Sequence, residues 1–183
     1  MYKKILLLHG WGGSDFPHWQ SWLAGELARD YGCVNFLRFW DFDNPKLDIW
    51  LRELQDALQD FRPDIVICHS LANTLWFHLC AKKELREIEK LYLVAPPSLN
   101  CTITELSEFF PVDIPPNLYA KETLLITSTN DPYMTQKEAN DLEKKLNIPM
   151  KVIQNGGHLN ADSGYGQWEW MLQELKAVTT SHA

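Results

Sequence analysis

A run of β-branched residues that ends at a serine constrains this chain more than any other feature. The run is Asp64-Ile65-Val66-Ile67-Cys68-His69, and Ser70 follows it directly. From Ser70 onward, apolar residues recur at the spacing of one helix face, at Leu71, Leu75 and Leu79. A strand that changes into a helix at a serine predicts a sharp turn with the hydroxyl standing clear of the sheet. The helix N-terminus behind that hydroxyl favours negative charge.

Two interpretations of this stretch are open. Small residues are needed two places before and after such a serine, because the backbones crowd there. Cys68 and Ala72 are small, although the glycines of the usual pattern are absent. Ser70 is then either an exposed nucleophile or simply the N-cap of the following helix, since serine is a favoured cap. Residues further along the chain favour the nucleophile.

Short apolar runs alternate with helical patterns along nearly the whole chain. Strands are expected at 3–8, 33–39, 64–69, 90–95, 123–128 and 150–153, and helices at 15–30, 47–58, 71–81, 135–146 and 166–178. The strands are continuous apolar runs, as in sheets that are covered on both faces. We therefore predict a single α/β domain over residues 1–183. Its architecture is a three-layer α/β/α sandwich around a doubly wound, mostly parallel sheet of about six strands.

One connection is unusually long for such a domain. Residues 97–120 contain four prolines and an apolar cluster at Leu106, Phe109 and Phe110. Connections of this length in compact domains are usually functional or mobile. The segment is either a short cap over a site or a surface loop with one helical turn.

Composition excludes several classes of protein. Apolar residues make up 45% of the chain and the net charge is −7, so neither disorder nor binding to nucleic acid or an anionic membrane is expected. The four cysteines have no C-x-x-C spacing and fit free thiols in a reducing compartment. The N-terminal apolar run is too short for a secretion signal, and no stretch is long enough to span a membrane. We expect a soluble cytoplasmic protein.

Three chemically active residues follow three different strands of the predicted sheet. Ser70 follows the third strand, Asp131 the fifth and His158 the sixth. Ligands bind outside the carboxyl ends of the strands in such sheets, so these side chains are expected to meet at one edge. Their order along the chain, Ser…Asp…His, is the order found in α/β-hydrolases.

Each residue has a physical task in nucleophilic catalysis. A serine hydroxyl needs a base to take its proton, and the imidazole of His158 titrates near neutral pH. Asp131 would fix the tautomer of that imidazole and stabilise its charged form. The backbone N–H groups of Leu71 and Trp11 are the expected donors to the oxyanion.

Aromatic residues predict the lining of the substrate pocket. The predicted lining is His9, Trp11, Phe16, Trp40, Phe109, Phe110 and Tyr133, and a compact pocket of this kind suits short or aromatic acyl groups. His9 is also expected to hold the Trp11 loop. His69 is not expected to be the base, because neighbouring strand residues face opposite ways. His18, His78 and His182 have no partner pattern.

These motifs make the chain similar to a known family. The segments ILLLHGWGGSDFPHWQSWL, VICHSLA, STNDPYM and NGGHLN resemble those of small serine hydrolases in the α/β-hydrolase superfamily. That group includes retinoblastoma-binding protein 9 and the bacterial YdeN-like proteins. The resemblance covers nearly the full length. It implies a minimal α/β-hydrolase without a large cap and with Ser70, Asp131 and His158 as its catalytic triad.

Other functions stay open at this level. The favoured function is cleavage of a small ester, thioester or amide without a cofactor, and the main alternative is a ligand- or protein-binding module on the same fold. A metal hydrolase is disfavoured, because no H-x-x-x-H or H-E-x-x-H pair is present. Nucleotide binding is disfavoured because the third glycine of the dinucleotide fingerprint and the Walker lysine are missing. The sequence does not identify the natural substrate, a protein partner or the oligomeric state.

Overall fold

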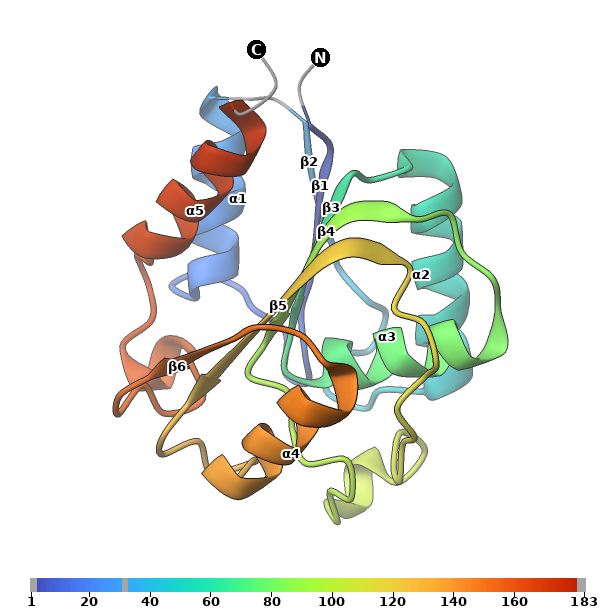
Figure 1. Cartoon of the computed structure of the whole chain (residues 1–183). Coiled ribbons are helices and arrows are strands. Elements are labelled where there is room, and N and C mark those ends of the chain that lie inside the picture. The colour runs from blue at the N-terminus through green and yellow to red at the C-terminus, as the bar shows by residue number, and fades with distance from the viewer. Residues whose placement is uncertain (1–2, 31–32, 181–183) are drawn as a thin grey trace.

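A parallel sheet forms the centre of the protein, seen in a computed structural model that describes residues 3–30 and 33–180 (Figure 1). Its described strands are β1 (Ile5–Leu8), β2 (Val34–Leu37), β3 (Ile65–His69), β4 (Ile88–Val94), β5 (Ala120–Ser128) and β6 (Met150–Ile153). The strand order is β2-β1-β3-β4-β5-β6, and every neighbouring pair is parallel. The predicted α/β fold is confirmed, and within the described residues the sheet is entirely rather than mostly parallel.

Helices cover both faces of this sheet. Helices α1 (Trp19–Asp30) and α5 (Glu169–Thr180) lie on one face, and α2 (Leu47–Phe61), α3 (Leu71–Lys82) and α4 (Gln136–Leu146) lie on the other (Figure 1). Single 3₁₀ turns occur at Thr104–Leu106 and Ala161–Ser163. Helix α1 starts later than predicted because the Nδ1 atom of His18 caps its N-terminus, accepting the Gln20 N–H at 3.1 Å. None of the described helices is both long and apolar enough to cross a bilayer.

The two layers have separate hydrophobic cores. In β1, Ile5 and Leu7 pack into the core under α1 and α5, whereas Leu6 and Leu8 pack into the core under α2 and α3. This alternation follows from strand geometry, in which successive side chains point to opposite faces. Because both faces are buried, the strands need apolar residues at every position, which explains the continuous runs in the sequence.

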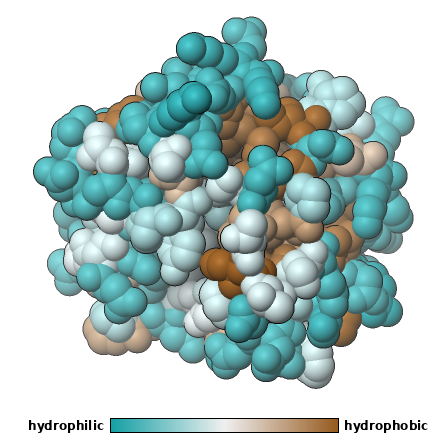
Figure 2. Space-filling model, turned by 90° about the horizontal axis from the view of Figure 1, so that it is seen from below, coloured by the Kyte–Doolittle hydropathy of each residue, from teal (hydrophilic) through white to brown (hydrophobic). Residues whose placement is uncertain are grey.

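The topology sets the position of the site. After β1 the chain builds β2 on one side of β1, and β3 then pairs with the opposite side. Loops that leave β1 and β3 in opposite directions open a crevice at the carboxyl ends of these strands, where ligands of doubly wound sheets bind. This edge is at the bottom of Figure 1. Figure 2 views the molecule from that end, and hydrophobic surface gathers around the centre and one side of this face.

Candidate active site

Ser70 sits at a sharp turn between β3 and α3. Its backbone has φ 54° and ψ −124°, values that a residue with a Cβ adopts only under strain. The turn is tied to β4, because Val94 O accepts both the Ser70 N–H at 3.0 Å and the Asn73 Nδ2–H at 2.9 Å. Asn73 Nδ2 also donates to Ser70 O at 2.7 Å. The Ser70 side chain makes no capping bond to α3, which removes the simple N-cap interpretation.

The loop after β1 comes very close to this serine. A Cβ atom on Gly10 would lie 2.7 Å from Ser70 Cβ and 3.1 Å from Ser70 Oγ, so only glycine fits at this position. Trp11 follows Gly10, and its N–H therefore lies beside the turn. In the described part of the chain neither the Trp11 N–H nor the Leu71 N–H donates to another group. Both expected oxyanion donors are thus available to a ligand.

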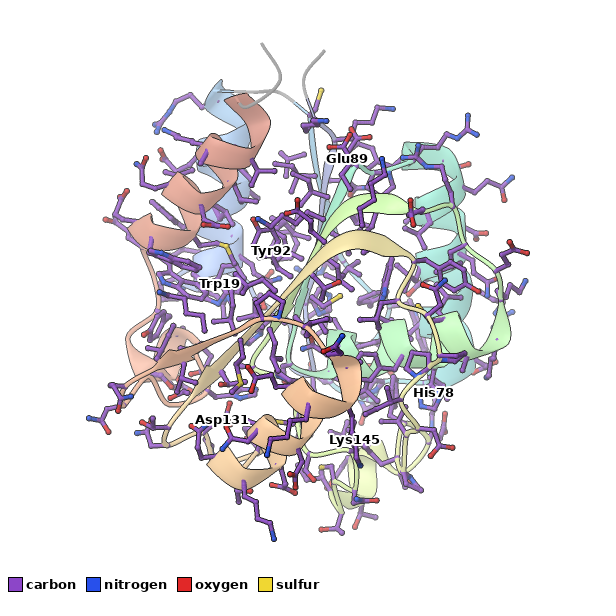
Figure 3. The ribbon with its side chains drawn as sticks, in the orientation of Figure 1. Trp19, His78, Glu89, Tyr92, Asp131 and Lys145 are labelled. Atoms are coloured by element: carbon purple, nitrogen blue, oxygen red, sulfur yellow. The ribbon has the colours of Figure 1, made fainter. Side chains whose placement is uncertain are left out.

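Ser70, His158 and Asp131 form a hydrogen-bonded row. Ser70 Oγ is 2.8 Å from His158 Nε2, and His158 Nδ1 is 2.9 and 3.0 Å from the two carboxylate oxygens of Asp131. The side chains of His158 and Asp131 are only 8% and 3% exposed. Since the carboxylate accepts at Nδ1, the neutral imidazole presents an unprotonated Nε2 to the serine hydroxyl. Asp131 lies between β5 and α4, at the lower edge of the sheet (Figure 3).

Neighbouring groups hold the acid and the base in place. Asp131 Oδ1 accepts the Tyr133 N–H at 2.9 Å. The Gly157 N–H donates to Asn130 Oδ1 at 2.7 Å, which links the loop of the acid to the loop of the base. On the opposite side, His69 Nε2 donates to the carbonyl oxygen of His158 at 3.1 Å. His69 thus contacts the backbone of His158 and, as its position predicts, makes no hydrogen bond to Ser70 within the described residues.

A cavity of about 370 Å³ opens beside this row. Strand-end loops supply most of its wall, and the 97–120 segment supplies an apolar part. The lining consists of Trp11, Gly12, Gly13, Ser14, Asp15, His18, His69, Ser70, Leu71, Pro97, Cys101, Ile103, Leu106, Tyr133, His158, Asn160, Ala161 and Asp162. The cavity is therefore large enough for a small substrate next to the serine.

Several residues predicted to line the pocket lie elsewhere. Trp11 and Tyr133 line the cavity, but His9, Phe16, Trp40, Phe109 and Phe110 do not. Phe109 is fully buried and packs edge-on against Trp50, and Phe110 packs against the same core. Phe16 and Trp40 are 84% and 58% exposed, turned toward solvent. For these positions the prediction is corrected, because sequence does not show which way an aromatic side chain turns.

His9 has a supporting position instead. It is buried among aromatic rings, and its Nε2 accepts the Phe39 N–H at 3.0 Å. Its Nδ1 lies 2.8 Å from Gly10 O, so the neutral ring donates there. Burial lowers the pKa of His9. This bond at Gly10 O fits the expectation that His9 holds the loop of Trp11.

His18 is a cavity residue that the sequence pattern did not reveal. It lines the cavity, and its ring centroid is 4.8 Å from that of His69, which is 5.3 Å from that of His158. Burial, with the nearby charges of His158 and His9, lowers the pKa of His18 to about 4. Burial also holds the pKa of His69 well below its usual value. The sequence contains no pattern that links these histidines, because His18 lies far from His69 and His158 in the chain. His182 lies outside the described residues.

Within residues 3–30 and 33–180, no group of three or more His, Cys, Asp or Glu side chains is arranged to hold a metal ion. The four cysteines are free. The geometry brings a serine hydroxyl, an imidazole, a carboxylate and two unpaired amide N–H groups together beside one cavity, an arrangement that could support acyl transfer.

Comparison with known proteins agrees with this class of site. The family model described as serine hydrolase matches residues 5–177. The chain therefore belongs to the serine hydrolase family, and it is similar to YdeN. It is 25% identical to the YdeN protein of Bacillus subtilis (strain 168) over 173 residues, which span 90% of each chain.

Solved structures share the fold. The crystal structure of Bacillus subtilis YdeN superposes with a TM-score of 0.84 over 96% of this chain and 97% of that one, at 23% identity. A YdeN-like protein from Pectobacterium atrosepticum gives a TM-score of 0.73 over 95% of this chain and 89% of that one, at 24% identity. The carboxylesterase CesB of Bacillus subtilis gives 0.63 over 100% of this chain and 85% of that one, at 12% identity.

Proposed function

We propose that the protein cleaves small esters, thioesters or amides through an acyl-enzyme on Ser70. The observation that carries the proposal is the hydrogen-bonded row of Ser70, His158 and Asp131, with its distances of 2.8 to 3.0 Å. His158 acts as general base and Asp131 as the orienting acid. Such a row makes a neutral hydroxyl reactive at a pH where it would otherwise be a weak nucleophile.

The first half-reaction transfers the acyl group to the enzyme. Ser70 Oγ attacks the carbonyl carbon while His158 Nε2 takes the hydroxyl proton. The carbonyl oxygen becomes an oxyanion and accepts from the N–H groups of Trp11 and Leu71. When the bond to the leaving group breaks, the imidazolium of His158 returns the proton to the departing alcohol, thiol or amine.

The second half-reaction restores the serine. Water attacks the acyl carbon with His158 taking one of its protons, and the bond to Ser70 Oγ breaks as the proton passes to that oxygen. The products are a carboxylic acid and the free enzyme. Asp131 stays ionised throughout, and its carboxylate stabilises the imidazolium in both halves.

An active-site probe tests the proposal directly. A fluorophosphonate should label the wild-type protein at Ser70 and leave Ser70→Ala unlabelled. Ser107→Ala, which changes an exposed serine of the 97–120 segment, serves as the matched control and should be labelled like the wild type. Turnover of p-nitrophenyl acetate should fall on the order of 10⁶-fold in kcat in Ser70→Ala. Equal labelling of all three proteins, or none of the wild type, would reject the acyl-enzyme and favour a binding module.

A further inference from the structure

Two buried side chains in the cavity wall have polar atoms without a partner. Ser14 and His18 are only 3% and 5% exposed, and both line the cavity beside Ser70. Ser14 Oγ and His18 Nε2 make no hydrogen bond to any described residue. Buried polar atoms in native proteins are nearly always paired, because an unpaired one has lost its bonds to water and gained none. A pair of such atoms in one wall indicates a place where a ligand supplies the missing partner.

The protonation of His18 is fixed by the helix that it caps. Its Nδ1 accepts the Gln20 N–H at 3.1 Å, and a backbone N–H can only donate. Burial keeps the ring neutral by lowering its pKa to about 4. A neutral imidazole carries one proton, so that proton is on Nε2. His18 therefore carries an unpaired hydrogen-bond donor within the cavity wall, and its neutral ring has no charge with which to bind an anion.

The charges of the cavity wall limit which substrate group could accept a hydrogen bond from His18. Asp15 and Asp162 line the cavity, and no lysine or arginine is among the described lining residues. Arg38 lies outside the wall and is already paired with Asp15 at 2.8 Å, so a substrate carboxylate buried here would have no free cation to compensate its lost hydration. Nε2 is also almost completely covered, so a hydrated ion cannot reach it. The acceptor that fits is a neutral oxygen.

We propose that His18, with Ser14 in the same cavity wall, forms a polar subsite for a neutral ether, hydroxyl or carbonyl oxygen of the substrate near its scissile bond. The inference rests on the proposed hydrolase function and names the class of ester that the site prefers. The His18 ring packs edge-on against His69, whose ring packs at a tilt against His158, so His69 alone separates His18 from the proposed base. His18 takes no part in bond making and determines specificity only.

Two variants of His18 distinguish its proposed role in the subsite from its role as the cap of α1. His18→Asn places an amide oxygen near the position of Nδ1, where it can still cap α1, and removes the group at Nε2. His18→Gln reaches the position of Nε2 and returns an N–H donor there. His78→Asn is the matched control, because His78 donates its own Nε2–H to Phe109 O and lies outside the cavity wall.

The measurement uses pairs of esters of equal length that differ by one ether oxygen in place of a methylene. The acyl arm compares p-nitrophenyl methoxyacetate with p-nitrophenyl butyrate, and the alcohol arm compares methoxyethyl acetate with butyl acetate. The readout is the ratio of kcat/KM for the ether ester to that for the alkyl ester. Differences in intrinsic reactivity cancel when this ratio is compared between wild type and variant.

The expected result is a fall of this ratio, on the order of 10- to 100-fold, in His18→Asn on one of the two arms. That arm tells which end of the substrate carries the oxygen. His18→Gln should recover part of the ratio, and His78→Asn should keep the wild-type ratio. A ratio that is the same in wild type and His18→Asn on both arms overturns the proposal.

Failure of the subsite is distinguishable from failure of the proposed function. Fluorophosphonate labelling of the wild type at Ser70 together with an unchanged ratio rejects only the subsite. An unlabelled wild type without turnover rejects the hydrolase function itself. Should His18→Asn fail to fold, Ser14→Ala carries the test: a fall of the ratio on the order of tenfold supports the subsite, and an unchanged ratio rejects it.

Discussion

The two sides of the cavity are built in different ways. On one side, Trp11, Ser70 and His158 come from loops that directly follow strands and are tied down by backbone hydrogen bonds. On the other side, Ile103 and Leu106 come from the 97–120 segment, which has a single 3₁₀ turn and packs through apolar side chains. Hydrogen bonds have a preferred geometry and hold particular atoms in place, whereas the hydrophobic effect has no preferred direction. Changes on the strand-end side should therefore alter chemistry, and changes on the segment side should alter stability and substrate choice.

The largest effect is expected on the strand-end side, at the orienting carboxylate. Asp131→Asn should lower kcat on the order of 10⁴-fold, because an amide donates toward Nδ1 and favours the wrong tautomer of His158. Steady-state kinetics with p-nitrophenyl acetate measures it. Asp113→Asn, at an exposed position in the segment, is the control and should stay within twofold of the wild type. An equally small change in kcat in both variants would mean that Asp131 takes no part in the mechanism.

The second effect concerns stability and lies on the segment side. Phe109→Ala should lower the free energy of unfolding by about 3–5 kcal/mol, because it empties a fully buried site against Trp50. Urea denaturation gives this value. Phe16→Ala, at a side chain that is 84% exposed, should change stability by less than about 0.5 kcal/mol. A loss below about 1 kcal/mol in Phe109→Ala would mean that this segment is not anchored by its apolar residues.

The third effect tests the close approach of the β1 loop to the elbow. Gly10→Ala would push a methyl group to 2.7 Å from Ser70 Cβ, so the loop or the serine has to shift. We expect kcat to fall on the order of 100-fold from this displacement. Gly25→Ala is the control, since its methyl group meets nothing within 4 Å and it lies within a helix. Equal activity of the two variants would contradict the proposed role of the β1 loop.

The fourth effect is a dependence of stability on pH. The pKa of His18 is near 4 in the folded protein and near 6.5 in the unfolded chain, so between these values the unfolded chain binds more protons. Stability must then fall as the pH falls through this window. Between pH 7 and pH 5, the titration of His18 should lower the free energy of unfolding by about 2 kcal/mol. Urea midpoints of wild type and His18→Asn should show a smaller loss in the variant, and equal losses would refute the assignment.

The smallest effect is on acyl-chain preference. The wild type should prefer short chains in a series of p-nitrophenyl esters, because the cavity has a volume of only about 370 Å³. Leu106→Ala enlarges the apolar side of that cavity and should raise kcat/KM for longer chains on the order of tenfold. The rate with the acetate should change little. A wild-type preference for long chains would contradict the prediction of a compact pocket.

Sequence patterns predicted the fold and the meeting of the three polar residues well. Strands buried on both faces leave continuous apolar runs, so their number and their positions along the chain could be predicted, whereas their order in the sheet came only from the structure. Ser70, Asp131 and His158 each follow a strand, and parallel strands bring such positions to one edge. Their catalytic roles stay a prediction until the labelling experiment is done.

The cavity wall could not be predicted to the same degree. Phe109 and Phe16 are both aromatic residues in loops, yet one is buried in the core and the other faces solvent. The sequence identifies the side chain, but it does not show whether the loop backbone turns that side chain toward the core or toward solvent. His18 was missed for a related reason, since its partners His69 and His158 are brought to it only by the folded sheet.

The backbone of Ser70 has a consequence for how this protein can change. At φ 54° and ψ −124°, the position suits a residue without a Cβ, and glycine would relax it. Ser70→Gly should thus give a more stable protein than Ser70→Ala, although both lack the hydroxyl. The backbone geometry thus favours glycine at this position, whereas the proposed chemistry needs the serine hydroxyl.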